Sequence, residues 1–173
     1  MSIMTTMRTV SGHKFAHRDP FNSVISIEDI GHALSHICRY NGHVQKFYSV
    51  AEHCVYVSQL VPQHLAMYGL LHDAAEAYIG DVTRPVRALF PNEEIENLEI
   101  PILRAVFEKV GLDPDIALEE VYNIDDQMVA LERPEWDIQC RLRSEGVVLR
   151  LNNWSPEEAR RKFFSRYYEI LGS

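Results

Sequence analysis

An apolar stretch near the middle of the chain, YGLLHDAAEAYIGD, carries four ionisable side chains: His72, Asp73, Glu76 and Asp81. Burying a bare charge is costly, so charged groups inside a protein are usually paired with each other or bound to a metal. A helix turns by about 100° per residue, which places His72 and Glu76 on one face, with Asp73 next to His72. One ion over this face would contact His72 and Asp73, with Glu76 close by. Two ligands hold a metal weakly, so the fold must bring further ligands from other segments.

Helix signals follow one another along the chain after about residue 25. Ser26, Ser49 and Ser155 are typical N-cap residues, and the last two precede a glutamate by three positions, which is the capping-box pattern. Gly80 and Gly172 are typical of the residue that follows a helix. Helices are therefore expected over residues 26–40, 48–61, 62–80, 83–90, 91–111, 114–133 and 155–172.

Prolines and two less regular segments complete this reading of the secondary structure. Pro101 should kink or split the long helix around it, and Pro134 should end the helix that precedes it. Residues 1–25 predict irregular or short-strand structure, and residues 146–153 predict a hairpin arm or a loop. As a whole the sequence predicts an all-α fold with six or seven helices in a single domain over residues 1–173.

Composition excludes several classes of protein. The net charge of −8 argues against a partner that is a nucleic acid polymer, because such proteins carry a basic face. Three cysteines, Cys38, Cys54 and Cys140, form no C-x-x-C pair and indicate reduced thiols in a cytoplasmic protein. The N-terminus is too polar for a signal peptide, and no apolar run approaches about 18 residues, so no membrane span is expected.

Two further side chains are candidates for completing a metal site. His53 lies among apolar residues in a capped helix, and Asp125 lies in a helix that is otherwise amphipathic. Together with the His-Asp pair at 72 and 73 they would supply two imidazoles and two carboxylates. That set suits Zn, Mn, Fe, Co or Ni better than Ca, which takes oxygen ligands only. Each residue alone has a plainer interpretation: His53 as a hydrogen-bonded core residue, and Asp125 with Asp126 as a solvated helix face.

Four segments together match one known pattern: ICRYNGHVQKFYSVAEHCVYVSQLV, GLLHDAAEAYIGDVTRPVR, IDDQMVALE and NNWSPEEARRKFFSRYYEILG. Through them the chain resembles the HD-domain metal-dependent phosphohydrolases, all-α enzymes defined by the pattern H…HD…D. Within that family it is most similar to the small YfbR-like 5′-deoxynucleotidases and to phage enzymes that hydrolyse deoxynucleoside triphosphates, including dATP. The resemblance covers about residues 9 to 172. It implies a divalent transition metal (Mn, Co, Zn, Fe or Ni) and allows Mg on the substrate phosphates.

The resemblance assigns roles to individual residues, the metal ligands first. These ligands match His53, His72, Asp73 and Asp125. The last position stays open between Asp125 and Asp126, although the family spacing D-x-x-x-x-A-x-E fits better from Asp125. A divalent ion lowers the pKa of a bound water from about 15.7 to about 7, which makes it a nucleophile at neutral pH.

Two catalytic candidates follow from the same comparison. Glu76 matches the acidic residue that these deoxynucleotidases use beside the attacking water, and an ion pair with an arginine is its plainer alternative. Arg39 matches an arginine that meets the phosphate or sugar of the substrate. The next position is often Trp in the deoxynucleotidases but is Tyr40 here, a departure at the expected sugar or base contact.

Several nearby residues are candidate substrate contacts. Asp81 would meet a sugar hydroxyl or, equally, cap the next short segment, and Thr83 has the same two interpretations. Pro85 would form a wall of the sugar or base pocket, although a proline at a helix start is purely structural in most proteins.

Basic side chains are candidates for the phosphates. Arg84 and Arg87 follow the His-Asp helix and would meet the β- and γ-phosphates of a triphosphate, although surface arginines without a ligand are more common. His43 and Lys46 lie near the site along the sequence and are further candidates for phosphate contacts.

The expected function is therefore metal-dependent hydrolysis of a 2′-deoxynucleotide. A triphosphohydrolase that releases triphosphate, with dATP as a candidate substrate, is slightly favoured over a monophosphatase because of the two arginines. A signalling-nucleotide phosphohydrolase and a non-catalytic nucleotide sensor are the alternatives. By resemblance, the protein is also expected to be a homo-oligomer, a dimer or larger.

Overall fold

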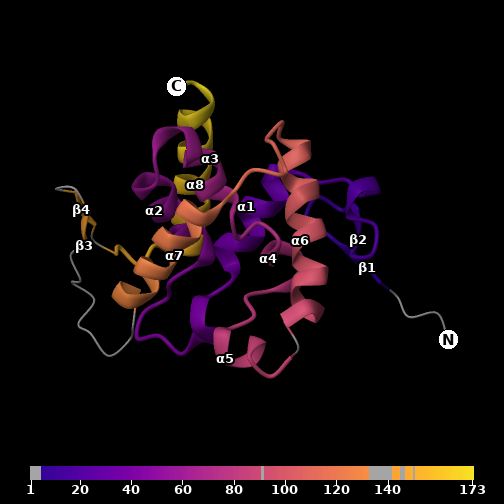
Figure 1. Cartoon of the computed structure of the whole chain (residues 1–173), viewed down its shortest axis with the longest axis horizontal. Helices are drawn as coiled ribbons and strands as arrows, with labels where there is room; N and C mark the ends of the chain where they lie inside the picture. Colours follow the sequence, from indigo (N-terminus) through magenta and orange to yellow (C-terminus); the bar gives the residue numbers. More distant parts are fainter. Residues whose placement is uncertain (1–4, 91, 133–141, 145–146, 150) are drawn as a thin grey trace.

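The computed structural model describes residues 5–90, 92–132, 142–144, 147–149 and 151–173, and these are mainly helical (Figure 1). The all-α prediction is confirmed. The α-helices are α1 Ile27–His36, α2 Val50–Leu60, α3 Ala66–Leu71, α4 Glu76–Ile79, α5 Arg84–Arg87, α6 Asn92–Lys109, α7 Glu119–Glu132 and α8 Pro156–Leu171. Short 3-10 helices η1 Pro20–Asn22, η2 Arg39–Gly42 and η3 Gln63–Leu65 connect some of them.

Helix α2 lies at the centre of the fold. Its residues from Val50 to Ser58 are all buried, and it packs against α1, α3, α7 and α8. A helix surrounded by others in this way is expected to be largely apolar, because little of it meets water. The buried polar side chains of α2 therefore need hydrogen-bond partners inside the protein.

The stretch that contains His72 is not one continuous helix, contrary to the expectation of a helix over 62–80. Helix α3 ends at Leu71, α4 begins at Glu76, and the four residues between them form turns. Hydrogen bonds there run to the residue three positions back, from Ala74 N–H to Leu71 O at 2.9 Å and from Glu76 N–H to Asp73 O at 3.0 Å. The interruption divides one expected helix into two, which accounts for eight α-helical segments among the described residues.

Other boundaries confirm or correct the expectations. Pro101 lies inside α6 without splitting it, and α7 begins at Glu119, later than expected. Pro134 and Cys140 lie outside the described residues. Short strands form two antiparallel pairs, β1 Thr6–Arg8 with β2 Lys14–Ala16 and β3 Leu142–Ser144 with β4 Val147–Leu149.

The predicted N-caps are confirmed, with one difference at α2. The hydroxyls of Ser26, Ser49 and Ser155 each accept a hydrogen bond from the backbone N–H three residues later. The buried carboxylate of Glu52 does not complete a capping box, because it accepts backbone N–H groups of residues 152–154 instead. Glu52 therefore ties the segment before α8 to the central helix.

Thr83 precedes α5 but makes no side-chain capping hydrogen bond. Among the described residues, no helix combines the length and the apolar character that crossing a bilayer requires.

Candidate metal centre

Close packing of α3 on α2 brings two histidines together. A Cβ added at Gly69 would lie 3.0 Å from the Ser58 Cα of α2, so the two helices approach each other where glycine has no side chain. His72 follows Gly69 by three residues and therefore reaches the face of α2 that carries His53. Both rings are buried, with His53 0% and His72 5% exposed.

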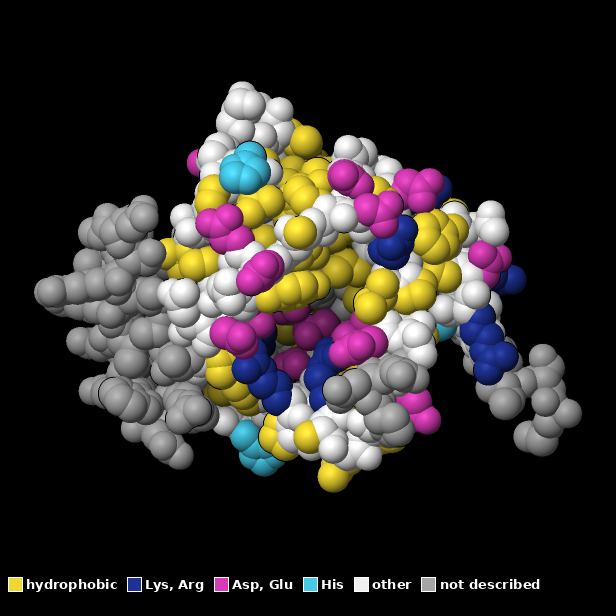
Figure 2. All heavy atoms as spheres, viewed as in Figure 1, with side chains coloured by type: hydrophobic (Ala, Val, Ile, Leu, Met, Phe, Trp, Pro, Cys, Tyr) yellow, Lys and Arg dark blue, Asp and Glu magenta, His cyan; other side chains and the backbone are white. Residues whose placement is uncertain are grey.

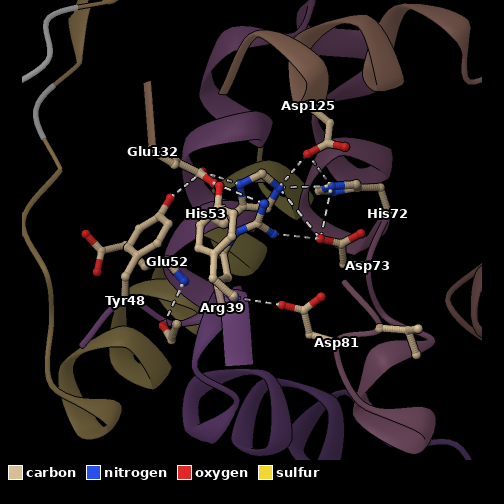
Figure 3. A network of polar contacts seen from close by, with 12 residues as sticks. Arg39, Tyr48, Glu52, His53, His72, Asp73, Asp81, Asp125 and Glu132 are labelled. Carbon is tan, nitrogen blue, oxygen red and sulfur yellow. Dashed lines mark hydrogen bonds and ion pairs between the residues drawn. The ribbon is translucent and has the colours of Figure 1, made fainter. Parts of the chain in front are cut away.

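Hydrogen bonds fix the orientation of both imidazoles, and Figure 3 shows the contact of His53 with Glu132. His53 Nδ1 lies 2.7 Å from the Glu132 carboxylate, and His72 Nδ1 lies 2.9 Å from the Gly69 carbonyl oxygen. A carboxylate and a carbonyl accept hydrogen bonds, so both Nδ1 atoms donate. The two Nε2 atoms then face each other at 3.3 Å. Outer hydrogen bonds of this kind hold ligating histidines in the tautomer that a metal needs.

Two carboxylates complete the cluster around these nitrogens. Asp125 Oδ1 lies 3.0 Å from His53 Nε2, and Asp73 Oδ2 lies 3.3 Å from His72 Nε2 and 3.6 Å from His53 Nε2. Ligand atoms that share an ion at about 2.0–2.2 Å are separated by about 3–4 Å, depending on the bond angle. His53, His72 and Asp125 therefore have ligand atoms close enough to share one ion, and Asp73 belongs to a second, overlapping group that shares His72. Cys54 lies beside the cluster, where its sulfur could join His72 and Asp73.

The structure distinguishes between the two neighbouring aspartates on α7. Asp125 turns towards the histidines, whereas the Asp126 side chain is 64% exposed and pairs with Arg84. Of the two aspartates left open by the sequence, Asp125 is thus the one within reach of the cluster.

The carboxylates around His53 favour a proton on its ring. Burial and the Arg39 cation oppose protonation of His53, but the carboxylates of Glu132 and Asp125 outweigh them and raise the pKa of His53 to about 9. Burial opposes ionisation of Asp125, but His53 and His72 hold its pKa well below the usual range. A metal that binds here must displace the proton of His53, so binding releases a proton.

Glu132 belongs to the candidate site, although its sequence position did not single it out. Its side chain is fully buried. One carboxylate oxygen accepts from His53 and from the Tyr48 hydroxyl at 2.7 Å, and the other from Arg39 Nε at 3.0 Å and the Tyr40 hydroxyl at 2.8 Å. Arg39 and His53 outweigh the effect of burial and keep the pKa of Glu132 well below its usual value. The Glu132 carboxylate therefore connects His53, one of the candidate metal ligands, to Arg39.

A signal for this role was present but weak. Glu132 follows Asp125 by seven residues, which is two helical turns, so the two carboxylates lie on the same face of α7. Glutamate near a helix end is usually solvated, and only the long-range contacts distinguish this one.

Replacing Glu132 with Ala is expected to destabilise the fold strongly. Removing one member of a buried ion pair leaves the other charge uncompensated, at a cost of about 3–5 kcal/mol. Urea unfolding followed by circular dichroism measures the change. The matched control is Tyr48→Phe, which removes one hydrogen bond to the same carboxylate and should cost about 1 kcal/mol. Similar small losses in both variants would show that Glu132 is not the central partner.

Arg39 and Tyr40 lie in a strained connection next to the cluster. Tyr40 and Asn41 have φ angles of 57° and 53°, in the left-handed region that side chains rarely adopt. This turn points the Tyr40 backbone N–H at Asp81 Oδ2, 3.2 Å away. The residue at the N-cap position of α5 is Thr83, so Asp81 does not have its alternative role as a helix cap. Burial lowers the pKa of Arg39, but Glu132 and Asp73 more than compensate and keep the guanidinium charged.

A cavity of about 850 Å³ opens onto the cluster. Figure 2 shows this hollow, with acidic side chains deep inside it and basic side chains beside them. Of the predicted catalytic and substrate residues, the lining includes Arg39, Tyr40, Glu76, Asp81, Pro85 and Arg87. His43 and Lys46 are exposed and do not belong to the described lining, so the structure does not bring them to the cluster.

Glu76 is the acidic group of the cavity that stands out. It is 7% exposed, and its Oε2 has no hydrogen-bond partner among the residues that the structure describes. Burial raises its pKa well above the usual value, and the neighbouring carboxylates of Asp73 and Asp81 raise it further. Among the described residues, no arginine forms an ion pair with Glu76, which was the alternative role expected for it. A buried carboxyl with an open oxygen is ready to hold or transfer a proton.

The two arginines of α5 reach the cavity mouth but are engaged by acids. Arg84 contacts Asp126 and lies 3.6 Å from Asp125 Oδ2. Arg87 forms a two-pronged pair with Glu99 of α6 and also donates to the Val82 carbonyl at 2.9 Å. In this state the arginines link α5 to α6 and α7, and an anion would have to compete for them.

Comparison with known proteins gives two relatives, whereas no family model matches the chain. A protein of Rhodobacter capsulatus described as uncharacterized is 35% identical over 114 residues, which is 61% of this chain and 58% of that protein. The uncharacterized protein YfdR of Escherichia coli is 42% identical over 130 residues, which is 75% of this chain and 71% of that protein. At that identity and coverage, the chain belongs to the same family as YfdR.

Proposed function

We propose that the protein is a metal-dependent phosphohydrolase of the HD type that acts on 2′-deoxynucleotides. One observation carries the proposal. The Nδ1 atoms of His53 and His72 already donate hydrogen bonds within the protein, and both Nε2 atoms therefore face the carboxylates of Asp73 and Asp125. Nitrogen and carboxylate ligands together favour Mn, Fe, Co, Ni or Zn. The cluster lies at a cavity lined by arginines, which supports a phosphate-bearing substrate.

The residues of the chain divide the chemical work between them. When bound, a divalent ion polarises a phosphate oxygen and lowers the pKa of a water molecule. Arg39 lies 3.6 Å from Asp73 through its Nη1 atom and would neutralise charge on the phosphoryl oxygens. Glu76 would take the proton of the attacking water or give one to the leaving oxygen, since burial and the carboxylates of Asp73 and Asp81 raise its pKa well above the usual value. Glu132 would hold Arg39 and His53 in place.

Arg84 and Arg87, which line the cavity, bear on how many phosphates the substrate carries. A monophosphate needs only the metal ligands and Arg39, whereas a triphosphate extends further and would take Arg87 from Glu99 and Arg84 from Asp126. Phosphate oxygens are strong acceptors for the two-pronged guanidinium. We therefore place a deoxynucleoside triphosphate first, with dATP as the candidate, and a monophosphate second.

Arg87→Ala is expected to discriminate between these two substrates. Hydrogen bonds to charged groups are worth about 1.5–3 kcal/mol, so kcat/KM for a triphosphate should fall about 10-fold to 100-fold while the value for a monophosphate changes little. Steady-state kinetics on both nucleotides measures this. Arg104→Ala is the control, because that arginine pairs with the exposed Asp115 on the surface. An equal loss on both substrates, or no loss, would contradict the triphosphate assignment.

Product analysis tests the function itself. The protein is incubated with Mn or Co and a panel of deoxynucleotides and ribonucleotides, and the products are separated. Nucleoside with triphosphate identifies a triphosphohydrolase, and nucleoside with single phosphate identifies a deoxynucleotidase. Metal binding without turnover of any deoxynucleotide would overturn the proposal in favour of a nucleotide sensor or a signalling-nucleotide enzyme.

A further inference from the structure

Part of the cavity lining is apolar and is not used by the chemistry described so far, although Glu96 and Glu99 of α6 also belong to the lining. Ile100 and Leu103 of α6 and Tyr122 and Val129 of α7 belong to the lining. Ile100 is 51% exposed and Tyr122 is 47% exposed, although both are large hydrophobic side chains. Leaving apolar surface in contact with water is unfavourable, and a ligand that covers it gains roughly 25 cal/mol per Å². Figure 2 shows hydrophobic side chains bordering the hollow.

The apolar part of the lining begins one helical turn away from Asp125, one of the candidate metal ligands. Tyr122 precedes Asp125 by three residues, and Val129 follows it by four, so the three side chains lie on one face of α7. Three residues of helix span about 4.5 Å. A nucleotide whose phosphate binds an ion held beside Asp125 would therefore have its base within reach of the Tyr122 ring.

The form of the lining suits a flat group. Tyr122 offers an aromatic face, Ile100 and Leu103 offer aliphatic surface from the neighbouring helix, and no described lysine or arginine belongs to this side of the lining. Stacking on an aromatic side chain is favourable for every nucleobase, because each base has a π-face. A sugar phosphate without a nucleobase would leave this surface in contact with water.

We infer that Tyr122 stacks on the base of the substrate and makes the site selective for nucleotides over sugar phosphates that lack a nucleobase. The inference rests on the proposed function for the position of the phosphate. It makes Tyr122 a specificity-determining residue, with Ile100 and Leu103 closing the other side of the ring.

The test compares Tyr122→Leu with Tyr122→Phe on two kinds of ligand. The first is the best nucleotide of the panel, measured by KM, and the second is the matching inorganic phosphate or tripolyphosphate, measured as a competitive inhibitor. Base stacking on one side chain is worth about 1–3 kcal/mol, so Tyr122→Leu should raise KM about 5-fold to 100-fold. Tyr122→Phe keeps the ring and should remain close to wild type. Inhibition by the inorganic ligand should not change in either variant.

The remaining outcomes separate this inference from the proposed function. Hydrolysis with an unchanged KM in Tyr122→Leu overturns the stacking role and leaves the phosphohydrolase intact. An equal weakening of nucleotide and inorganic ligand also overturns it, because the effect would not come from the ring. If the wild-type protein hydrolyses nothing, calorimetric titration of the Mn-loaded protein with nucleotides decides. If nucleotides bind and Tyr122→Leu weakens that binding, the stacking role is supported although the enzymatic proposal fails. If no nucleotide binds, both proposals are overturned.

Discussion

Asp125→Ala is expected to lose the bound metal and, with it, hydrolysis. Asp125 Oδ1 is the oxygen nearest to His53 Nε2, at 3.0 Å, and His53 and His72 keep its carboxylate ionised despite burial. Removing a group that only orients a ligand already costs about 10-fold to 100-fold in metal affinity or activity, so removing a ligand should cost more. Competition with a chelator measures the affinity, and elemental analysis after dialysis measures the metal content.

The chain offers a closely matched control for this experiment. Asp126→Ala removes the same group from the next residue, but its side chain is exposed and contacts Arg84. Its metal content and turnover should stay close to wild type, and circular dichroism checks that both variants are folded. If Asp126→Ala lost the metal while Asp125→Ala kept it, the assignment of the last ligand would be wrong.

Glu76→Gln is expected to lower turnover strongly while the metal stays bound. Loss of a positioned acid or base typically reduces the rate by about 10²-fold to 10⁴-fold. The amide has nearly the same shape as the carboxyl, but it cannot accept or release a proton at neutral pH. Glu76 is outside the two groups of side chains whose ligand atoms converge, so the metal affinity should hardly change. Single-turnover kinetics together with the metal content separates the two effects.

Glu96→Gln serves as the control for Glu76, because Glu96 lines the same cavity but is exposed. It should retain most of the activity. Full activity in Glu76→Gln would remove this residue from the mechanism. Loss of the metal in Glu76→Gln would instead make it a ligand.

Local features of the chain were predicted well, because their physical cause is local. Serine caps depend on a backbone N–H three residues away, and Ser26, Ser49 and Ser155 form them as expected. The interruption after Leu71 was missed, because the apolar pattern continues through it and nothing in the segment breaks a helix. The interruption follows the place where Gly69 of α3 packs closely on the central helix.

The sequence by itself determined the helical class, the serine-capped starts of three helices and the residue types that could hold an ion. Periodicity and capping require only neighbouring residues, and the cost of buried charge marks His72 and Asp73 as unusual wherever they lie. Only the tertiary structure decided which partners meet. It chose Asp125 over Asp126, gave Glu132 its buried contacts with His53 and Arg39, and left His43 outside the cavity. These contacts join residues up to 93 positions apart, and no local pattern encodes separations of that length.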